Sequence, residues 1–162
     1  MERFGLAPLT ASYGKGVSGL SLVLGMVVPH TPRIIHEETA PAFLGPLPGA
    51  LHQAREWLDR MNVAGLVLIS CHWVSSFNHY LNATPVHEGR LTAQECPDLI
   101  RDVTYRFRGH PEVAQQIADR AASAGMPVYA IDDPAYVWDY GSVVPLRYLT
   151  PTGEMPVVNL SV

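Results

Sequence analysis

The chain has 162 residues, a formal net charge of −4 at neutral pH, and 48% hydrophobic against 16% charged residues. This length predicts one domain, large enough to bury roughly 70% of the surface of the unfolded chain. The acidic balance excludes the broad basic surface of a nucleic-acid-binding protein. No apolar stretch reaches the roughly 18 residues of a membrane-spanning helix. We therefore expect a protein that binds neither nucleic acid nor a membrane.

The composition of the N-terminal segment and the number of cysteines indicate the domain boundary and the compartment. Residues 1–19 are rich in Gly, Ser and Ala without a clear period, so we interpret them as an N-terminal extension to a domain spanning residues 20–162. This start lacks the charged region and long apolar core of a signal peptide. The two cysteines, Cys71 and Cys96, make no disulfide framework. Together these features indicate a cytoplasmic protein.

The first predicted elements alternate between strand and helix. Residues 20–28 are an apolar run that predicts a strand, within which Gly25 indicates a close approach of another backbone. A proline-rich loop follows over residues 29–48, and loops of this length are usually functional or disordered. Residues 49–61 place apolar side chains at helical spacing and predict a helix. Residues 66–69 are apolar and β-branched in part, and they predict a second, buried strand that ends in Ser70, Cys71 and His72.

The second half of the chain continues the alternation. Residues 78–91 predict an edge strand and turn with Glu88-Gly89 at the tip, and residues 97–106 predict a short helix. Residues 109–125 begin with a Gly-His-Pro-Glu helix start and end in glycine, which predicts a longer helix. A strand is expected over residues 127–131. This order predicts an α/β fold whose mostly parallel sheet is covered by helices on both faces.

The last predicted strand, residues 155–162, stays apolar to the final residue. A buried strand without a closing loop suggests that the fold is incomplete at the C-terminus. Such a strand would leave a bare sheet edge, which favours pairing with another chain. We therefore expect a homo-oligomer in which a second copy covers this surface.

Two of the predicted strands end in a histidine. His30 directly follows residues 20–28, and His72 follows residues 66–70 after Cys71. Ligand-binding residues of open α/β sheets collect at the carboxyl ends of strands, so we predict that both imidazoles bind one metal ion. We interpret Cys71 as a small buried filler, because a thiolate ligand would suit zinc or an iron–sulfur site better.

Carboxylates are scarce near these histidines. Glu37 and Glu38 are the only ones close in sequence to a proposed ligand, and we interpret both as solvated. His36 shares the proline-rich loop and is the best further histidine candidate. The residues alone leave open a zinc-type hydrolase that uses His30, His72 and a local acid.

Four segments carry a family resemblance: His72-Trp73, Glu88–Thr92, Glu95–Tyr105 and Asp139–Tyr148. Together they resemble the class III extradiol ring-cleavage dioxygenases of the LigB-like superfamily, over about residues 23–162. The branch that cleaves 3,4-dihydroxyphenylacetate (homoprotocatechuate) is the most similar. Other branches carry Asp-His-Gly where this chain has Asp-Tyr-Gly at 139–141.

The resemblance implies an Fe(II) ion, or else Mn(II) or Zn(II), held by His30, His72 and a glutamate. It implies insertion of dioxygen beside the two hydroxyls of a catechol such as 3,4-dihydroxyphenylacetate. Two imidazoles and one carboxylate leave three positions open on iron, enough for a bidentate catecholate and dioxygen. Tyr140 is the candidate catalytic residue, although it is as easily a packed aromatic. The family's glutamate ligand and acid/base histidine come from segments that follow the last strand here, and this chain lacks both.

Two functions therefore stay open. The first is an extradiol dioxygenase, or the half of one that carries two of its three metal ligands. The second is a non-catalytic or truncated metal-binding remnant or subunit of the same fold, completed by a partner chain. Iron content and oxygen consumption with a catechol separate the two.

Overall fold

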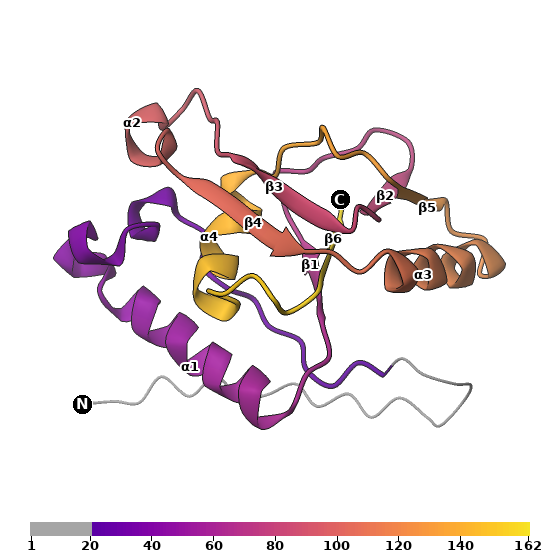
Figure 1. Cartoon of the computed structure of the whole chain (residues 1–162), viewed down its shortest axis with the longest axis horizontal. Coiled ribbons are helices and arrows are strands. Elements are labelled where there is room, and N and C mark those ends of the chain that lie inside the picture. Colours follow the sequence, from indigo (N-terminus) through magenta and orange to yellow (C-terminus); the bar gives the residue numbers. More distant parts are fainter. Residues whose placement is uncertain (1–20) are drawn as a thin grey trace.

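A computed structural model describes residues 21–162, so the predicted extension over residues 1–19 lies outside the described residues (Figure 1). Three short 3₁₀ turns come first, at Pro32–Ile34, Glu37–Thr39 and Ala42–Leu44. The helices are α1 (Pro46–Arg60), α2 (Pro97–Ile100), α3 (Pro111–Ser123) and α4 (Tyr140–Leu149). The strands are β1 (Leu66–Ile69), β2 (His79–Asn82), β3 (Val86–Arg90), β4 (Thr104–Arg108), β5 (Val128–Ile131) and β6 (Val157–Leu160).

The strands form two sheets. The larger has the order β1-β6-β2-β5, in which β1 pairs with β6 and β2 with β5, both in parallel. A single antiparallel bridge between Leu81 and Leu160 joins these two parallel pairs. Strands β3 and β4 form a separate antiparallel ribbon. The predicted α/β fold with a mostly parallel sheet is confirmed.

Helices cover both faces of the larger sheet, as predicted (Figure 1). On one face, α3 places Ala114 and Ala118 against Leu81 of β2 and Val158 of β6. These small side chains, four residues apart, share one face of the helix and let it approach the strands closely. On the other face, α4 lies between α1 and the sheet, and eight of its ten residues are buried. The larger core is therefore built around α4.

An aromatic cluster attaches the β3–β4 ribbon to the start of α4. The Trp138 ring is 1% exposed and lies 4.3 Å from the His87 ring and 5.9 Å from the Phe107 ring, centroid to centroid. The backbone N–H of Trp138 donates a hydrogen bond of 2.7 Å to the Tyr105 hydroxyl. Buried aromatic rings contribute a large apolar area and prefer defined mutual geometries. The cluster thus fixes the position of the residue that directly precedes the cap of α4.

The strand predicted over residues 20–28 is wrong for the described residues 21–28, which are extended but paired to no strand of the described chain. Leu24, Met26 and Val28 pack against the core, whereas Val27, between Met26 and Val28, is 97% exposed. Alternating burial is the sequence signal of a strand, but a ladder also needs a partner, which local pattern does not specify. Among residues 21–162, no atom lies within 4 Å of a Cβ added at Gly25, so the predicted close approach of another backbone is not found there.

Two further segments differ from the prediction. Residues 78–91 contain two strands in different sheets, β2 and β3, and Glu88-Gly89 lie inside β3 rather than at a turn. The polypeptide instead changes direction around Pro85, which cannot donate to a ladder. Residues 97–106 form only the single turn of α2 before β4 begins at Thr104.

The predicted bare edge at residues 155–162 is also wrong. Strand β6 lies in the middle of the sheet between β1 and β2, and the edges are β1 and β5. The order of strands in a sheet need not follow their order in the chain. Exposed apolar side chains occur instead on β1, where Val67 is 51% and Ile69 60% exposed. The prediction that this strand is buried is therefore wrong, because β1 is an edge strand with one face open to solvent.

Within residues 21–162, no helix combines the length and the apolar character that crossing a membrane requires.

Candidate metal centre

The turn after β1 carries two of the candidate ligands. The strand ends at Ile69, and the Trp73 N–H then donates to the Ser70 carbonyl at 3.3 Å. Side chains alternate between faces only while the backbone is a strand. In the turn, the adjacent side chains of Cys71 and His72 are both exposed. Our interpretation of Cys71 as a buried filler is therefore wrong.

His30, Cys71 and His72 form a cluster whose potential ligand atoms all lie within 4.8 Å of one another. The two imidazole rings, predicted to bind one ion, have centroids 5.3 Å apart and planes inclined by 76°. Donor atoms that each lie about 2.0–2.3 Å from one ion are at most about 4.6 Å apart. A small rotation of the rings is enough to reach that separation, so the donor set fits a transition-metal ion.

Tyr140, the first residue of α4, lies beside both histidines. Its ring centroid is 4.4 Å from that of His72 and 6.4 Å from that of His30. Burial, followed by the negative charge of Glu95, raises the pKa of the Tyr140 hydroxyl. The hydroxyl is therefore protonated at neutral pH and can donate a hydrogen bond toward a group held between the histidines.

A hydrogen-bonded chain below the cluster joins β1, α4 and β6. Asp139 caps α4, since its Oδ1 accepts from the Ser142 N–H at 2.9 Å and from the Ser70 hydroxyl at 2.8 Å. Ser70 Oγ in turn accepts from the His72 N–H at 3.2 Å. Ser142 Oγ donates to Asp139 Oδ2 at 3.0 Å and accepts from the Asn159 amide at 3.1 Å. These bonds hold the His72 backbone in a defined position relative to the start of α4.

Gly141 leaves the space that the His72 ring occupies. A Cβ at this position would lie 2.6 Å from His72 Cδ2 and 2.8 Å from Asp139 Oδ1, both shorter than side chains tolerate. Only glycine lets the α4 backbone come this close to the ring. The Asp-Tyr-Gly segment thus supplies a helix cap, an aromatic neighbour and a cradle for His72 in three consecutive residues.

The carboxylates near the proline-rich loop lie elsewhere. Glu37 Oε2 pairs with His52 Nε2 at 3.0 Å, and His36 lies 3.6 Å from Asp102 and 4.0 Å from Glu38. None of them belongs to the histidine–cysteine cluster. In residues 21–162, that cluster contains no carboxylate.

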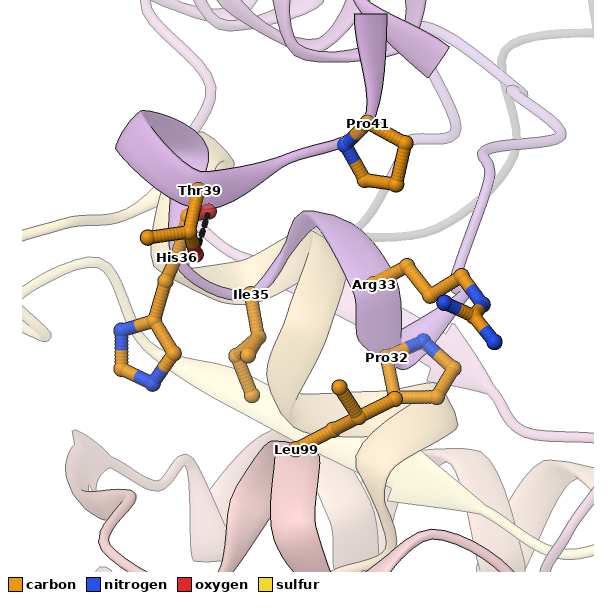
Figure 2. Close-up of a pocket in the computed structure, with 7 residues that line it drawn as sticks. All are labelled: Pro32, Arg33, Ile35, His36, Thr39, Pro41 and Leu99. Atoms are coloured by element: carbon orange, nitrogen blue, oxygen red, sulfur yellow. Dashed lines mark hydrogen bonds between the residues drawn. The ribbon is translucent and has the colours of Figure 1, made fainter. Parts of the chain in front are cut away.

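His36 lines a small surface pocket together with the first 3₁₀ turns and α2 (Figure 2). Figure 2 shows its ring on one side of Ile35, with Pro32 and Arg33 on the other. The pocket residues do not include His30, Cys71 or His72. The structure therefore does not bring His36 to the candidate metal centre.

Sequence reasoning missed the participation of Cys71 and the support from Ser70, Asp139, Ser142 and Asn159. The Asp-x-x-Ser spacing at 139–142 is a helix-cap signal that could have revealed part of this chain. The adjacency of Cys71 and His72 after a strand was visible as well. Whether their side chains lie on the same side depends on where β1 ends, which the sequence did not specify.

Comparison with known proteins shows the family. Residues 24–162 match the family described as the catalytic LigB subunit of aromatic ring-opening dioxygenase. The chain is 33% identical over 143 residues to 3,4-dihydroxyphenylacetate 2,3-dioxygenase of Escherichia coli, covering 86% of this chain and 52% of that protein. It is 24% identical over 147 residues to the 2-aminophenol 1,6-dioxygenase beta subunit of Pseudomonas sp, covering 86% and 48% respectively.

A solved structure agrees on the fold. The crystal structure of the uncharacterized protein JW3007 from Escherichia coli K12 superposes with a TM-score of 0.53 at 22% identity, over 72% of this chain and 40% of that chain. The chain belongs to the LigB family of aromatic ring-opening dioxygenase subunits, which confirms the resemblance. It spans about half the length of the relatives it matches.

Proposed function

We propose that residues 20–162 are the N-terminal part of an extradiol ring-cleaving dioxygenase domain, in which His30 and His72 bind the catalytic metal ion. The observation that carries this proposal is the convergence of the two imidazoles from separate segments beside Tyr140. The substrate class is a catechol such as 3,4-dihydroxyphenylacetate, in keeping with the name of one relative. Two free thiols, Cys71 and Cys96, fit a reducing, cytoplasmic location.

The residues of this chain have distinct tasks in that reaction. An Fe(II) ion, with Mn(II) or Zn(II) as alternatives, supplies the Lewis acidity that brings a catechol and dioxygen together. His30 and His72 hold the ion, and Asp139 and Ser70 keep the His72 backbone in place. The protonated Tyr140 hydroxyl donates a hydrogen bond to an oxygen atom of the bound reactants.

The test compares oxygen uptake with metal content. Iron-loaded protein should consume oxygen with 3,4-dihydroxyphenylacetate but not with 4-hydroxyphenylacetate, which lacks the second hydroxyl needed for bidentate binding. His30→Ala and His72→Ala should each lose bound metal and this uptake, because one imidazole alone holds the ion weakly. His79→Ala is the control, since His79 is exposed on β2.

The outcomes separate the two candidate functions. Equal uptake by the wild type and both histidine variants would contradict the proposal. Metal binding that depends on both histidines, without any uptake, would favour the metal-binding subunit without catalysis.

Replacement of Tyr140 by phenylalanine should slow turnover far more than it weakens metal binding. The change keeps the ring beside His72 and removes only the hydroxyl, whose loss from a transition-state contact lowers kcat and kcat/KM together. Steady-state kinetics and metal titration on the same preparation check this. Unchanged kcat would assign Tyr140 to packing alone.

We further propose that a partner chain, most simply a second copy, completes the centre. The described cluster contains no carboxylate, and the β1 edge exposes Val67 and Ile69, a surface suited to a partner. One relative is named as a beta subunit. We expect the isolated monomer to be a poor or inactive dioxygenase, so its mass in solution should be measured alongside oxygen uptake. Robust ring cleavage by a monomer would contradict this proposal.

A further inference from the structure

A set of buried polar side chains extends away from the candidate metal centre along β6, β2 and β3. Among residues 21–162, five of these side chains carry a buried nitrogen or oxygen atom without a hydrogen-bond partner: Asn82, Thr84, His87, Trp138 and Asn159. Each of the five residues is at most 5% exposed. Because these atoms are already enclosed in the fold, only a small molecule can reach them. Buried polar groups that lack a protein partner are usually satisfied by ordered water.

Asn82 and Asn159 occupy opposite positions on neighbouring strands. The antiparallel bridge joins Leu81 of β2 to Leu160 of β6. In an antiparallel ladder, the next opposite pair is therefore Asn82 with Asn159. Leu81 packs against α3, and successive side chains point to opposite faces of a sheet, so both asparagines point toward α4. Opposite side chains of this kind have Cβ atoms about 4.5–5.5 Å apart.

The unpartnered atoms of the two asparagines are complementary. Asn159 donates through Nδ2 to Ser142 Oγ at 3.1 Å, which leaves its Oδ1 to accept. Asn82 accepts through Oδ1 from the Thr84 N–H at 3.1 Å, which leaves its Nδ2 to donate. A water molecule accepts and donates at once, so it can bridge a donor and an acceptor that lie too far apart for a direct bond. The Thr84 hydroxyl in the same region is a third candidate partner of such a water.

The same polar groups continue to the β3–β4 ribbon. A Cβ at Gly109 would collide with both the Thr84 carbonyl oxygen and His87 Nε2, so these two groups lie side by side where only glycine fits. His87 in turn stacks against Trp138. The unpartnered atoms therefore belong to one connected region and are not isolated defects of packing. Such a region can offer the two to four polar partners that a buried water requires.

We propose that a buried water molecule bridges Asn82 and Asn159, and that Asn82 is thereby a positioning residue of the metal centre. Asn159 donates to Ser142, and Ser142 donates to Asp139, the residue that caps α4. Asp139 in turn supports the backbone of His72 through one hydroxyl group. A bridge to the second polar atom of the Asn159 amide prevents the amide from rotating and keeps its bond to Ser142. This inference rests on the two-histidine site of the proposed function.

NMR of the metal-free 162-residue protein tests the water directly. The side-chain amide protons of Asn82 should show a nuclear Overhauser effect to water, with the sign that a long-lived internal water gives. Asn82→Leu identifies these signals because it removes them. The side-chain amide of Gln53, which is exposed on α1, is the comparison and should contact only fast-exchanging surface water. An Asn82 amide without a long-lived water contact would overturn the proposed bridge.

Titration with Co(II) tests the positioning role without relying on activity. Asn82→Leu should weaken Co(II) binding by roughly 2–30-fold, the range for residues that act through a connected network. Leu81→Val changes the opposite face of the same strand and should bind Co(II) as the wild type does. In an Asn159→Leu background, Asn82→Leu should have no further effect, because the path is already interrupted.

Thermal melting of each metal-free variant shows whether it is folded. If Asn82→Leu does not fold, Asn82→Ser takes its place, since a serine hydroxyl can still accept from the Thr84 N–H. Wild-type Co(II) affinity in the folded variant would overturn the positioning role, as would additive effects of the changes at Asn82 and Asn159. Absence of Co(II) binding by the wild type would overturn the two-histidine site and the positioning role with it, whereas the NMR result on the water would still hold.

Discussion

Replacing Gly141 by alanine should displace the His72 ring and strongly weaken metal binding at the two histidines. The added Cβ would lie 2.6 Å from His72 Cδ2 and 2.8 Å from Asp139 Oδ1. Asp139 is held by Ser70 and by the first turn of α4, so the exposed ring of His72 is the group that must move. Overpacking of this kind typically costs about 1–3 kcal/mol.

Metal titration and thermal unfolding of the same variant measure the two effects separately. We expect metal affinity to fall by at least about 10–100-fold, as for loss of an orienting partner, while the fold survives. Gly49→Ala is the matched control, because Gly49 is exposed within α1 and a Cβ there meets no atom within 4 Å. Wild-type metal affinity in Gly141→Ala would show that the glycine does not set the position of His72.

Acidification should destabilise the protein through His87. This residue is 4% exposed against Trp138. Burial lowers its pKa from the usual 6.5 to about 4, although a backbone hydrogen bond at Val157 and the charge of Asp132 act in the opposite direction. The unfolded chain therefore binds a proton that the folded chain refuses between these two pH values. The contribution of neutral, buried His87 to the free energy of unfolding is fully present above pH 6.5. It is lost as the pH falls toward 4, and the loss is on the order of 3 kcal/mol.

Denaturant unfolding at several pH values between 7 and 4 measures this loss. His87→Phe keeps an aromatic ring beside Trp138 but removes the titrating group. The slope of its unfolding free energy against pH should therefore be smaller, by the equivalent of about one bound proton. His79→Gln, at an exposed position on β2, should retain the wild-type slope. If the slope of His87→Phe equals that of the wild type, then His87 is not the group responsible.

Elements whose start, periodicity and end are all encoded in neighbouring residues were predicted well. Helix α3 has proline at its first position and ends before Gly125, whose φ of +76° suits glycine. Helix α1 follows from its apolar periodicity, and the position of strand β1 follows from its apolar run, although β1 is half exposed rather than buried. The pairing of strands was not predictable, since residues 21–28 carry a strand pattern without a partner and β6 lies in the middle of the sheet. Pairing depends on contacts between distant segments, which no local window contains.

The candidate site shows the same division. His30 and His72 were visible from their position after apolar runs and from the family resemblance, and Tyr140 from the Asp-Tyr-Gly segment. The exposed position of Cys71 depended on the end of β1 one residue before Ser70, because a continued strand would have turned adjacent side chains to opposite faces. The contact of Gly141 with His72 joins residues that are far apart in the sequence. Only the fold brings them together.

The unpaired segment before His30 gives the two histidines unequal mechanical support. His72 follows a strand that is hydrogen-bonded to β6, and its backbone N–H donates to Ser70 Oγ, so the backbone at this end of the site is anchored to the sheet. Within the described chain, residues 21–30 make no backbone hydrogen bond to another segment, and they are held by side-chain contacts, among them that of His30 Nε2 with Cys71 Sγ at 3.7 Å. Segments with few such bonds open at a low free-energy cost. An ion bound by both imidazoles would therefore link residues 21–30 to the end of β1. Loss of that ion would lower the free-energy cost of opening this segment.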